Sequence, residues 1–234
     1  MVEEIAVRTN DLSKLYKVGR SHVVALNQVN LEIKKGTFVA VVGTSGSGKS
    51  TLLNMLAGLE PPSAGSVEVA GCRIDKMSQA ELAAFRRDHV GFVFQSFNLM
   101  QEMTALDNVA LPLTFRGMGK AERRKRAARA LTTLGLGTHL NHKPSQMSGG
   151  EQQRVGIARA LVSNPEIVFA DEPTGNLDSH TAAATLDLFR RLIAHYHQTW
   201  IMVTHDRHLA SYADVIVSIG DGRIQDITHT NHMD

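Results

Sequence analysis

One glycine-rich segment constrains this sequence more than any other feature. Its residues fit the pattern G-x-x-x-x-G-K-[ST]; they are Gly43, Thr44, Ser45, Gly46, Ser47, Gly48, Lys49 and Ser50. The segment follows the apolar run Phe38–Val42 and precedes the helical run Leu52–Leu56, which is the context that this pattern requires. Glycines let backbone N–H groups turn inward around phosphate oxygens, and the start of a helix adds partial positive charge. The segment therefore predicts a binding loop for the phosphates of a nucleoside triphosphate.

Three side chains of this phosphate loop have roles that follow from the pattern. Lys49 is placed to reach the β- and γ-phosphates, and the Ser50 hydroxyl is placed to bind Mg²⁺. Thr51 is placed to touch the α-phosphate. GTPases, kinases and motor ATPases share such a loop, so the loop alone does not choose among them.

Short apolar runs predict the fold class. Runs of four or five apolar residues without alternation are typical of strands that are covered on both faces, and helical patterns lie between some of them. An α/β layered domain with a mostly parallel sheet and flanking helices follows. The strands are expected at Phe38–Val42, Val90–Phe94, Ile167–Ala170, Ile201–Thr204 and Val215–Val217, and the helices at Lys120–Leu134 and Thr181–Tyr196.

Alternating side chains near the N-terminus predict a second kind of sheet. Val29, Leu31 and Ile33 alternate with polar residues, and Val67 and Val69 flank a glutamate. Such alternation is typical of antiparallel strands with one face in water.

Two adjacent acids, Asp171 and Glu172, end the apolar run Ile167–Ala170. A carboxylate at the carboxyl end of a buried strand can hold Mg²⁺ beside a phosphate loop. The next residue points elsewhere, so Glu172 can orient and activate an attacking water. These two positions predict the metal and catalytic carboxylates of a nucleotide hydrolase.

A second glycine-rich helix start lies just upstream of these acids. Ser148-Gly149-Gly150-Glu151 opens an apolar helical run that ends at Leu161, and a helix start of this kind is a second site for anions. This segment resembles the signature motif of the ABC ATPases. Four further residues resemble elements of that family in the expected order: the adenine-stacking aromatic Tyr16, the Q-loop Gln95, the D-loop Asp178 and the switch histidine His205.

Within that family the sequence is most similar to the lipoprotein-release and macrolide-exporter branch, which includes a cell-division relative. The segments Phe97-Asn98-Leu99 and Thr104–Val109 carry this similarity, together with Ala170–Asp178. Met147 stands where the family's signature usually has leucine, an apolar replacement of similar size. Glu151 stands where many members have glutamine.

The resemblance implies a P-loop NTPase core with an antiparallel β subdomain and an inserted helical subdomain. The core and β part are expected over residues 1–95 and 148–225, and the helical subdomain over about 96–147. Residues 226–234 are polar and are expected to form a loose tail.

The resemblance also implies a mechanism based on a head-to-tail dimer that buries two ATP molecules. Ser148, Gly149, Gly150 and Glu151 of one copy would close over the ATP held by the phosphate loop of the other. In that mechanism Glu172 would act as the general base or water-orienting group, and His205 would contact the γ-phosphate. Mg²⁺ would be held by Ser50, Gln95 and Asp171, the last directly or through water.

Composition and charge bear on the partners. The formal net charge is +2, which gives no reason to expect a nucleic-acid partner. A single cysteine, Cys72, excludes an internal disulfide and fits a reducing cytosol. The N-terminus does not read as a signal peptide, and no apolar run approaches the ~20 residues needed to cross a bilayer. We therefore expect a peripheral protein at the cytoplasmic face of the cell membrane, with a separate integral membrane permease.

Three other functions compete with a transporter ATPase. An ABC ATPase of the same branch can regulate a cell-envelope or cell-division complex without transport. Ribosome-acting relatives usually carry two cassettes, and chromosome relatives insert a long coiled coil, for which residues 96–147 leave no room. A kinase would leave Ser148 and His205 without a role.

Overall fold

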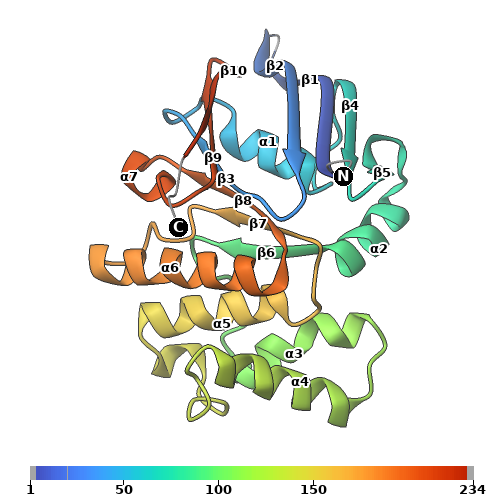
Figure 1. Ribbon diagram of the computed structural model, residues 1–234. Coiled ribbons are helices and arrows are strands. Elements are labelled where there is room, and N and C mark those ends of the chain that lie inside the picture. The colour runs from blue at the N-terminus through green and yellow to red at the C-terminus, as the bar shows by residue number, and fades with distance from the viewer. Residues whose placement is uncertain (1–3, 20, 231–234) are drawn as a thin grey trace.

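The computed structural model describes residues 4–19 and 21–230, and its strands form two sheets (Figure 1). The larger sheet has the strand order β10-β9-β3-β8-β7-β6. Its pairs are parallel except for the antiparallel pair of β9 and β10 at one edge. The strands are β3 (Phe38–Val42), β6 (Val90–Phe94), β7 (Ile167–Asp171), β8 (Thr199–Thr204), β9 (Val215–Gly220) and β10 (Arg223–His229).

The larger sheet is covered on both faces, as its unbroken apolar runs predict. Every residue of β3 is buried, and so is every residue of β8. Side chains of β3 alternate between two separate cores: Val39 and Val41 belong to one, and Ala40 and Val42 to the other. The expected α/β class with a mostly parallel sheet is therefore confirmed.

The smaller sheet is antiparallel and has the order β2-β1-β4-β5. Val29, Leu31 and Ile33 of β2 are buried, whereas the residues between them are exposed, so the predicted wet face is confirmed. The strands are β1 (Ile5–Val18), β2 (Ser21–Lys34), β4 (Ala64–Val69) and β5 (Cys72–Arg73).

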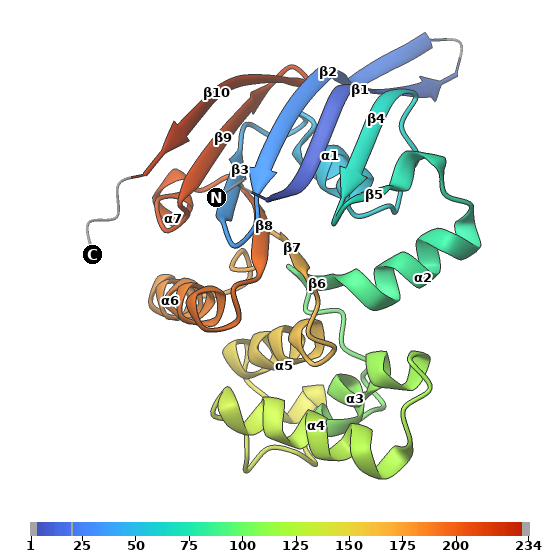
Figure 2. The ribbon, with the colours of Figure 1, turned by 45° about the vertical axis from the view of Figure 1, so that its right-hand side comes forward.

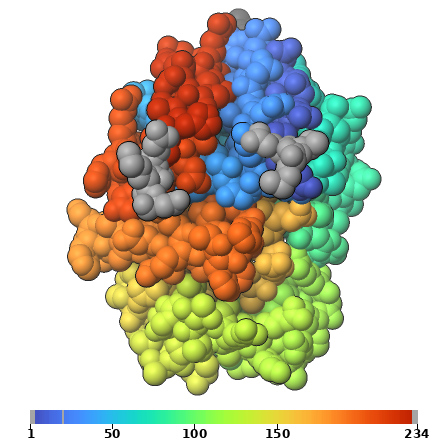
Figure 3. Space-filling model, viewed as in Figure 1, coloured from blue at the N-terminus to red at the C-terminus, as the bar shows by residue number. Residues whose placement is uncertain are grey.

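Helices cover the two faces of the larger sheet unequally. In Figures 1 and 2, α1 lies with the antiparallel sheet on one face, and α5 and α6 lie on the other. The helices α3 and α4 pack beyond α5 and form the lower part of the space-filling view, below the band made by α6 (Figure 3). The helices are α1 (Lys49–Leu56), α2 (Gln79–His89), α3 (Ala105–Phe115), α4 (Lys120–Thr133), α5 (Gly149–Leu161), α6 (Ser179–Tyr196) and α7 (Arg207–Ala210).

The segment expected to be a helical subdomain, residues 96–147, contains α3, α4 and a 3₁₀ turn at Pro144–Gln146. We propose that this segment forms a separate helical subdomain. Within the described ranges, no helix combines the length and apolar character needed to cross a membrane.

The expectation of a loose tail from residue 226 is wrong for residues 226–229. These residues complete β10, and Ile227 and Thr228 pair with β9. β10 is an edge strand whose side chains are mostly exposed, so its polar sequence carries no apolar pattern to reveal it. Residues 231–234 lie outside the described residues.

Candidate functional site

The phosphate loop joins the buried strand β3 to α1 and depends on glycine at Gly48. Gly48 precedes α1 with a backbone φ of 102°, and Gly46 has a φ of 78°. A Cβ atom at Gly48 would lie 2.4 Å from the carbonyl oxygen of Ala25, which is closer than Cβ atoms in proteins come to other atoms. A side chain at Gly48 would therefore displace β2 or the loop that presents the start of α1.

Lys49 lies folded across this loop. Its Nζ donates hydrogen bonds to the carbonyl oxygens of Gly43 and Thr44, each at 2.9 Å. The side chain is 8% exposed, so little water screens its charge. The cation and the first N–H groups of α1 therefore face the same small space, which suits a polyphosphate.

Asp171 lies at the carboxyl end of β7 beside the start of α1. Its Oδ1 atom is buried and has no hydrogen-bond partner among the described residues, and the Ser50 side chain lies close enough to its carboxyl group to act on its pKa. Burial raises the pKa of Asp171, the negative charge of Glu172 raises it further, and Ser50 and Lys49 act in the opposite direction. An orphaned carboxylate oxygen next to a hydroxyl is a donor set that fits Mg²⁺, which usually takes one or two protein carboxylates plus phosphate oxygens.

Glu172 and His205 contact each other directly. The two carboxylate oxygens of Glu172 lie 2.9 and 3.0 Å from Nδ1 of His205. The strands β7 and β8 are neighbours, with Asp171 opposite Val203, so the residue after each strand lies at the same edge of the sheet. Glu172 has a φ of 45°, and its N–H donates to the carbonyl of Val203 at 3.0 Å, which fixes the direction of its side chain. Both residues expected to act in catalysis thus lie together at the end of the sheet.

Gln95 reaches the same edge from β6, where Phe94 pairs with Asp171. The side-chain amide of Asn176 donates to the backbone carbonyl of Gln95 at 3.0 Å. A Cβ atom at Gly175 would lie 2.7 Å from the side-chain nitrogen of Gln95, so this glycine leaves space for the glutamine. Gln95 is therefore close to the loop that follows Glu172.

Tyr16 comes to the phosphate loop from the antiparallel sheet. Its hydroxyl donates to the carboxylate of Glu60 at 2.6 Å, and Thr51 lies close enough to act on the pKa of Tyr16. The ring is half-buried. An aromatic surface is thus placed next to the residue expected to touch the α-phosphate.

The start of α5 lies apart from these groups. Ser148 caps α5 in a reciprocal arrangement: its N–H and hydroxyl donate to the Glu151 carboxylate at 2.8 and 2.9 Å, and the N–H of Glu151 points back to the hydroxyl. Gly149 and Gly150 form its first turn. Since α5 and α1 lie on opposite faces of the larger sheet (Figure 2), one copy does not bring its two glycine-rich helix starts together.

Asp178 takes a structural position at the start of α6. Its carboxylate accepts hydrogen bonds from the N–H groups of His180 and Thr181 and from the Thr181 hydroxyl. These bonds lower the pKa of Asp178. Asp178 therefore caps α6, next to the loop that carries Asn176.

Two residues that support the site were missed by the sequence analysis. Arg159 of α5 donates to the carbonyl oxygens of Phe97 and Asn98, which both have positive φ. The signal for Arg159 was an arginine within the otherwise apolar run that ends at Leu161. Glu60, which holds Tyr16, has no pattern in the sequence that singles it out.

Comparison with known proteins gives one family and several close relatives. A family model described as "ABC transporter" matches residues 26–175. The lipoprotein-releasing system ATP-binding protein LolD of Chromohalobacter salexigens is 45% identical over 95% of this chain and 94% of that protein. The macrolide export ATP-binding/permease protein MacB of Syntrophobacter fumaroxidans is 46% identical over 94% of this chain but only 31% of that protein.

A solved structure gives the same assignment. The dimeric structure of a post-hydrolysis state of the ATP-binding cassette MJ0796, bound to ADP and Pi, superposes with a TM-score of 0.89. Its sequence is 43% identical, and the match covers 97% of this chain and all of that chain.

Proposed function

The chain belongs to the ABC transporter family. We propose that two copies pair head to tail and that each ATP is bound between a surface of one copy and a different surface of the other. The chain is an ATP-binding and ATP-hydrolysing subunit of a transporter. The observation that carries the proposal is the separation of the two anion-binding helix starts within one copy. The start of α1 holds Lys49, whereas the start of α5 holds Ser148 on the other face of the sheet.

Pairing of two copies gives Ser148 a ligand. In a head-to-tail pair, Ser148, Gly149 and Gly150 of one copy face the triphosphate held by residues 43–51 of the other. Each ATP then contacts both copies, so nucleotide stabilises the pair and its hydrolysis releases the pair. A relative of known structure, MJ0796, is a dimer bound to ADP and Pi, which supports this arrangement.

The geometry supports specific roles in hydrolysis. Glu172 orients a water and accepts its proton, because its carboxylate lies at the open edge of the sheet rather than in the core. His205 fixes the rotamer of Glu172 and faces the γ-phosphate. Lys49 neutralises charge on the phosphates as the bond breaks.

Ser50, Asp171 and Gln95 are the residues that would hold Mg²⁺. The bound ion supplies positive charge that neutralises the phosphates. Among the described residues there is no cluster of three or more histidine, cysteine or acidic side chains suited to a metal, so this site depends on the nucleotide for its remaining ligands.

We propose that a membrane permease docks in a groove between α2, α3 and the start of β6. The groove has a volume of about 630 Å³, and its largest exposed apolar side chain is Phe115, which is 67% exposed. Its charged lining consists of arginines, so a short helix with an apolar face and acidic residues fits it. The lining includes Leu59, Ala83, Arg86, Arg87, Phe92, Phe94, Leu111, Phe115 and Arg159.

This docking groove touches both nucleotide-sensing parts of the chain. Phe94 lines the groove and immediately precedes Gln95. Arg159 lines it from α5, the helix that Ser148 begins, and its guanidinium holds the carbonyl of Phe97 at 2.8 Å. A permease helix in the groove therefore contacts the residue before Gln95 and the far end of the helix that Ser148 begins.

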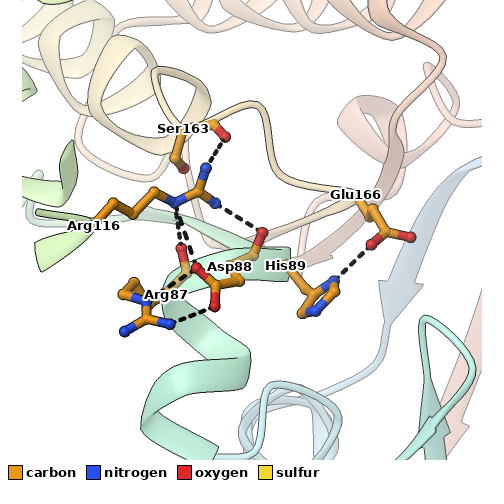
Figure 4. Close-up of polar contacts among 6 residues, drawn as sticks. All are labelled: Arg87, Asp88, His89, Arg116, Ser163 and Glu166. Carbon is orange, nitrogen blue, oxygen red and sulfur yellow. Dashed lines mark hydrogen bonds and ion pairs between the residues drawn. The ribbon is translucent and has the colours of Figure 1, made fainter. Parts of the chain in front are cut away.

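Arg116 fixes the walls of the docking groove (Figure 4). From the end of α3 it donates to the carbonyl oxygens of Arg87 and Asp88 at the end of α2, at 3.0 and 2.8 Å, and to that of Ser163 after α5, at 2.6 Å. One cation therefore joins the ends of three helices, so motion of one helix is passed to the others.

The docking groove gives a testable prediction. Replacing Phe115 by aspartate should reduce the membrane-bound fraction of the chain about tenfold or more in cells that hold its permease, since burying a phenylalanine is worth about 1.5–3 kcal/mol. The ATPase activity of the purified chain should not change, because Phe115 lies outside the nucleotide site. Membrane fractions are compared by immunoblot.

The matched control is Ile227→Asp, which places the same charge at an exposed apolar residue on β10, 42% exposed. It should leave membrane binding unchanged. Equal loss of binding in both variants, or none in the Phe115 variant, contradicts docking in this groove.

Similarity to LolD and MacB supports a place in the lipoprotein-release and macrolide-export branch. Accordingly we propose that the chain lies at the cytoplasmic face of the membrane as a peripheral subunit. In the MacB relative one protein carries both ATP-binding and permease functions by name, and this chain matches 31% of it. A separate permease chain would supply the remainder here.

A further inference from the structure

A histidine lies against the acid that caps α5. The imidazole Nε2 of His139 is 3.4 Å from Oε1 of Glu151, and both side chains are about one-quarter exposed. The other carboxylate oxygen of Glu151, Oε2, accepts both bonds from Ser148. Glu151 is thus held between His139 and Ser148.

The loop that carries His139 is firmly placed. Nδ1 of His139 contacts the Thr138 hydroxyl at 3.0 Å, and its ring packs edge-on against His142 with centroids 4.9 Å apart. The carbonyl of His142 accepts the N–H of Ala105 at the start of α3. His139 therefore approaches Glu151 from a loop that is tied to a different helix.

Glu151 carries a negative charge at the place where the proposed function needs to receive a triphosphate. Hydrogen bonds from the N–H and hydroxyl of Ser148 lower the pKa of Glu151, and the charges of His139 and Arg154 lower it further. Its carboxylate is one hydrogen bond from the Ser148 hydroxyl. A carboxylate so close to an incoming γ-phosphate disfavours pairing unless a cation offsets its charge.

The charged and titratable groups around His139 come from two elements. Glu151 and Arg154 lie on α5, and His142 lies in the same loop. Lys143 pairs instead with Glu102, at 3.2 Å. Arg154 keeps its charge at all relevant pH values, whereas a histidine changes charge between about pH 5 and pH 8. Of the two basic side chains beside Glu151, His139 is thus the one whose residue type changes charge in this pH range.

We propose that His139 is a positioning residue for the ATP-driven pair: in its protonated form it holds Glu151 in place and offsets its charge, so that pairing on ATP becomes weaker as pH rises. This inference rests on the proposed function, because only a head-to-tail pair brings a triphosphate to Ser148. It concerns how that site is regulated. This regulation breaks no covalent bond of the protein or the nucleotide; it depends only on whether the imidazole of His139 carries a second proton.

The test measures pairing rather than hydrolysis. Chains carrying Glu172→Gln are titrated with MgATP at about pH 6 and about pH 8, and the concentration of half-maximal pairing is read by analytical ultracentrifugation. The midpoint should rise about threefold to fivefold between these pH values, the range expected for a partly exposed pair. Adding His139→Gln should raise the midpoint at the lower pH and remove this part of the pH dependence.

Two further variants separate electrostatics from folding. Glu151→Gln keeps a side chain that can form the same cap, and in that background His139→Gln should have no further effect on the pH dependence. His229→Gln removes an exposed histidine on β10 and should keep the full dependence.

Each outcome bears on a distinct claim. An unchanged pH dependence in the His139 variant overturns the inference, as does an equal effect of that variant with and without the Glu151 carboxylate. Absence of pairing at every pH in the parent chain overturns the proposed function instead. Parallel steady-state assays should show a change in KM for ATP rather than in kcat.

Discussion

Replacing Glu172 by glutamine is expected to lower the rate of ATP hydrolysis about 10²–10⁴-fold while ATP still binds, the range that a positioned general base contributes. The amide has the shape of the carboxylate but accepts no proton from water. The phosphate loop, Lys49 and Ser50 are unchanged, so affinity for the nucleotide should be kept. Phosphate release is measured by a coupled assay, and binding by a fluorescent ATP analogue.

The contact between Glu172 and His205 sharpens this prediction. Both carboxylate oxygens lie within 3.0 Å of Nδ1 of His205, so His205 orients the same group that the variant neutralises. The variants Glu172→Gln and His205→Ala should therefore not be additive. Glu122→Gln, on the exposed face of α4, is the matched control and should hydrolyse ATP normally. Near-normal turnover by the Glu172 variant would mean that Glu172 is not the general base.

Replacing Asp171 by asparagine should raise the Mg²⁺ concentration needed for half-maximal hydrolysis about 10–100-fold, the usual cost of losing a group that supports a metal. The orphaned Oδ1 atom beside Ser50 is the basis for this expectation. Activity is measured over a range of free Mg²⁺. The control Asp187→Asn lies on the exposed face of α6 and should not change the requirement.

The same variant should not weaken the nucleotide-free fold. Burial and Glu172 raise the pKa of Asp171 in the folded chain, so folding favours the protonated form. The stability linked to this group is present at low pH and is lost as pH rises through the raised pKa. Asparagine carries no charge, so the variant should melt at or above the parent's temperature at neutral pH. A lower melting temperature, with an unchanged Mg²⁺ requirement, would mean that Asp171 is structural.

Local patterns in the sequence were enough for the elements that position the site. The strand before Gly43 and the strand before Asp171 are unbroken apolar runs, and both are fully or almost fully buried. The alternation at Val29, Leu31 and Ile33 shows directly which face of β2 is buried. These signals succeed because burial on one or both faces fixes which side chains a strand can carry.

Such local patterns could not predict contacts between segments that are far apart in the chain. The Glu172–His205 contact requires β7 and β8 to be neighbours, and the sequence order does not specify strand order within a parallel sheet. The bonds from Arg116 to three carbonyl oxygens, and from Tyr16 to Glu60, likewise join segments far apart in the chain. β10 was missed because an exposed edge strand needs no apolar residues.

The role of Ser148 came from resemblance and from an anion-binding helix start rather than from any contact within one copy. Its capping bonds to Glu151 are what an ordinary helix start also shows. In the proposed function only a second copy gives this segment a ligand, so the proposal depends on the pairing of copies.

That claim is tested most directly by cross-linking between two labelled chains. Both carry Glu172→Gln, and Cys72, which is half-exposed, is replaced by serine. One chain receives a cysteine at Ser45 in the phosphate loop, and the other receives a cysteine at Ser148. With MgATP and a short bifunctional thiol reagent, the mixture should give cross-links between the two kinds of chain and none within either kind alone. Cross-links between identical chains would contradict a head-to-tail pair. An equal yield of cross-links between the two kinds of chain with and without ATP would contradict a pair that is held by the nucleotide.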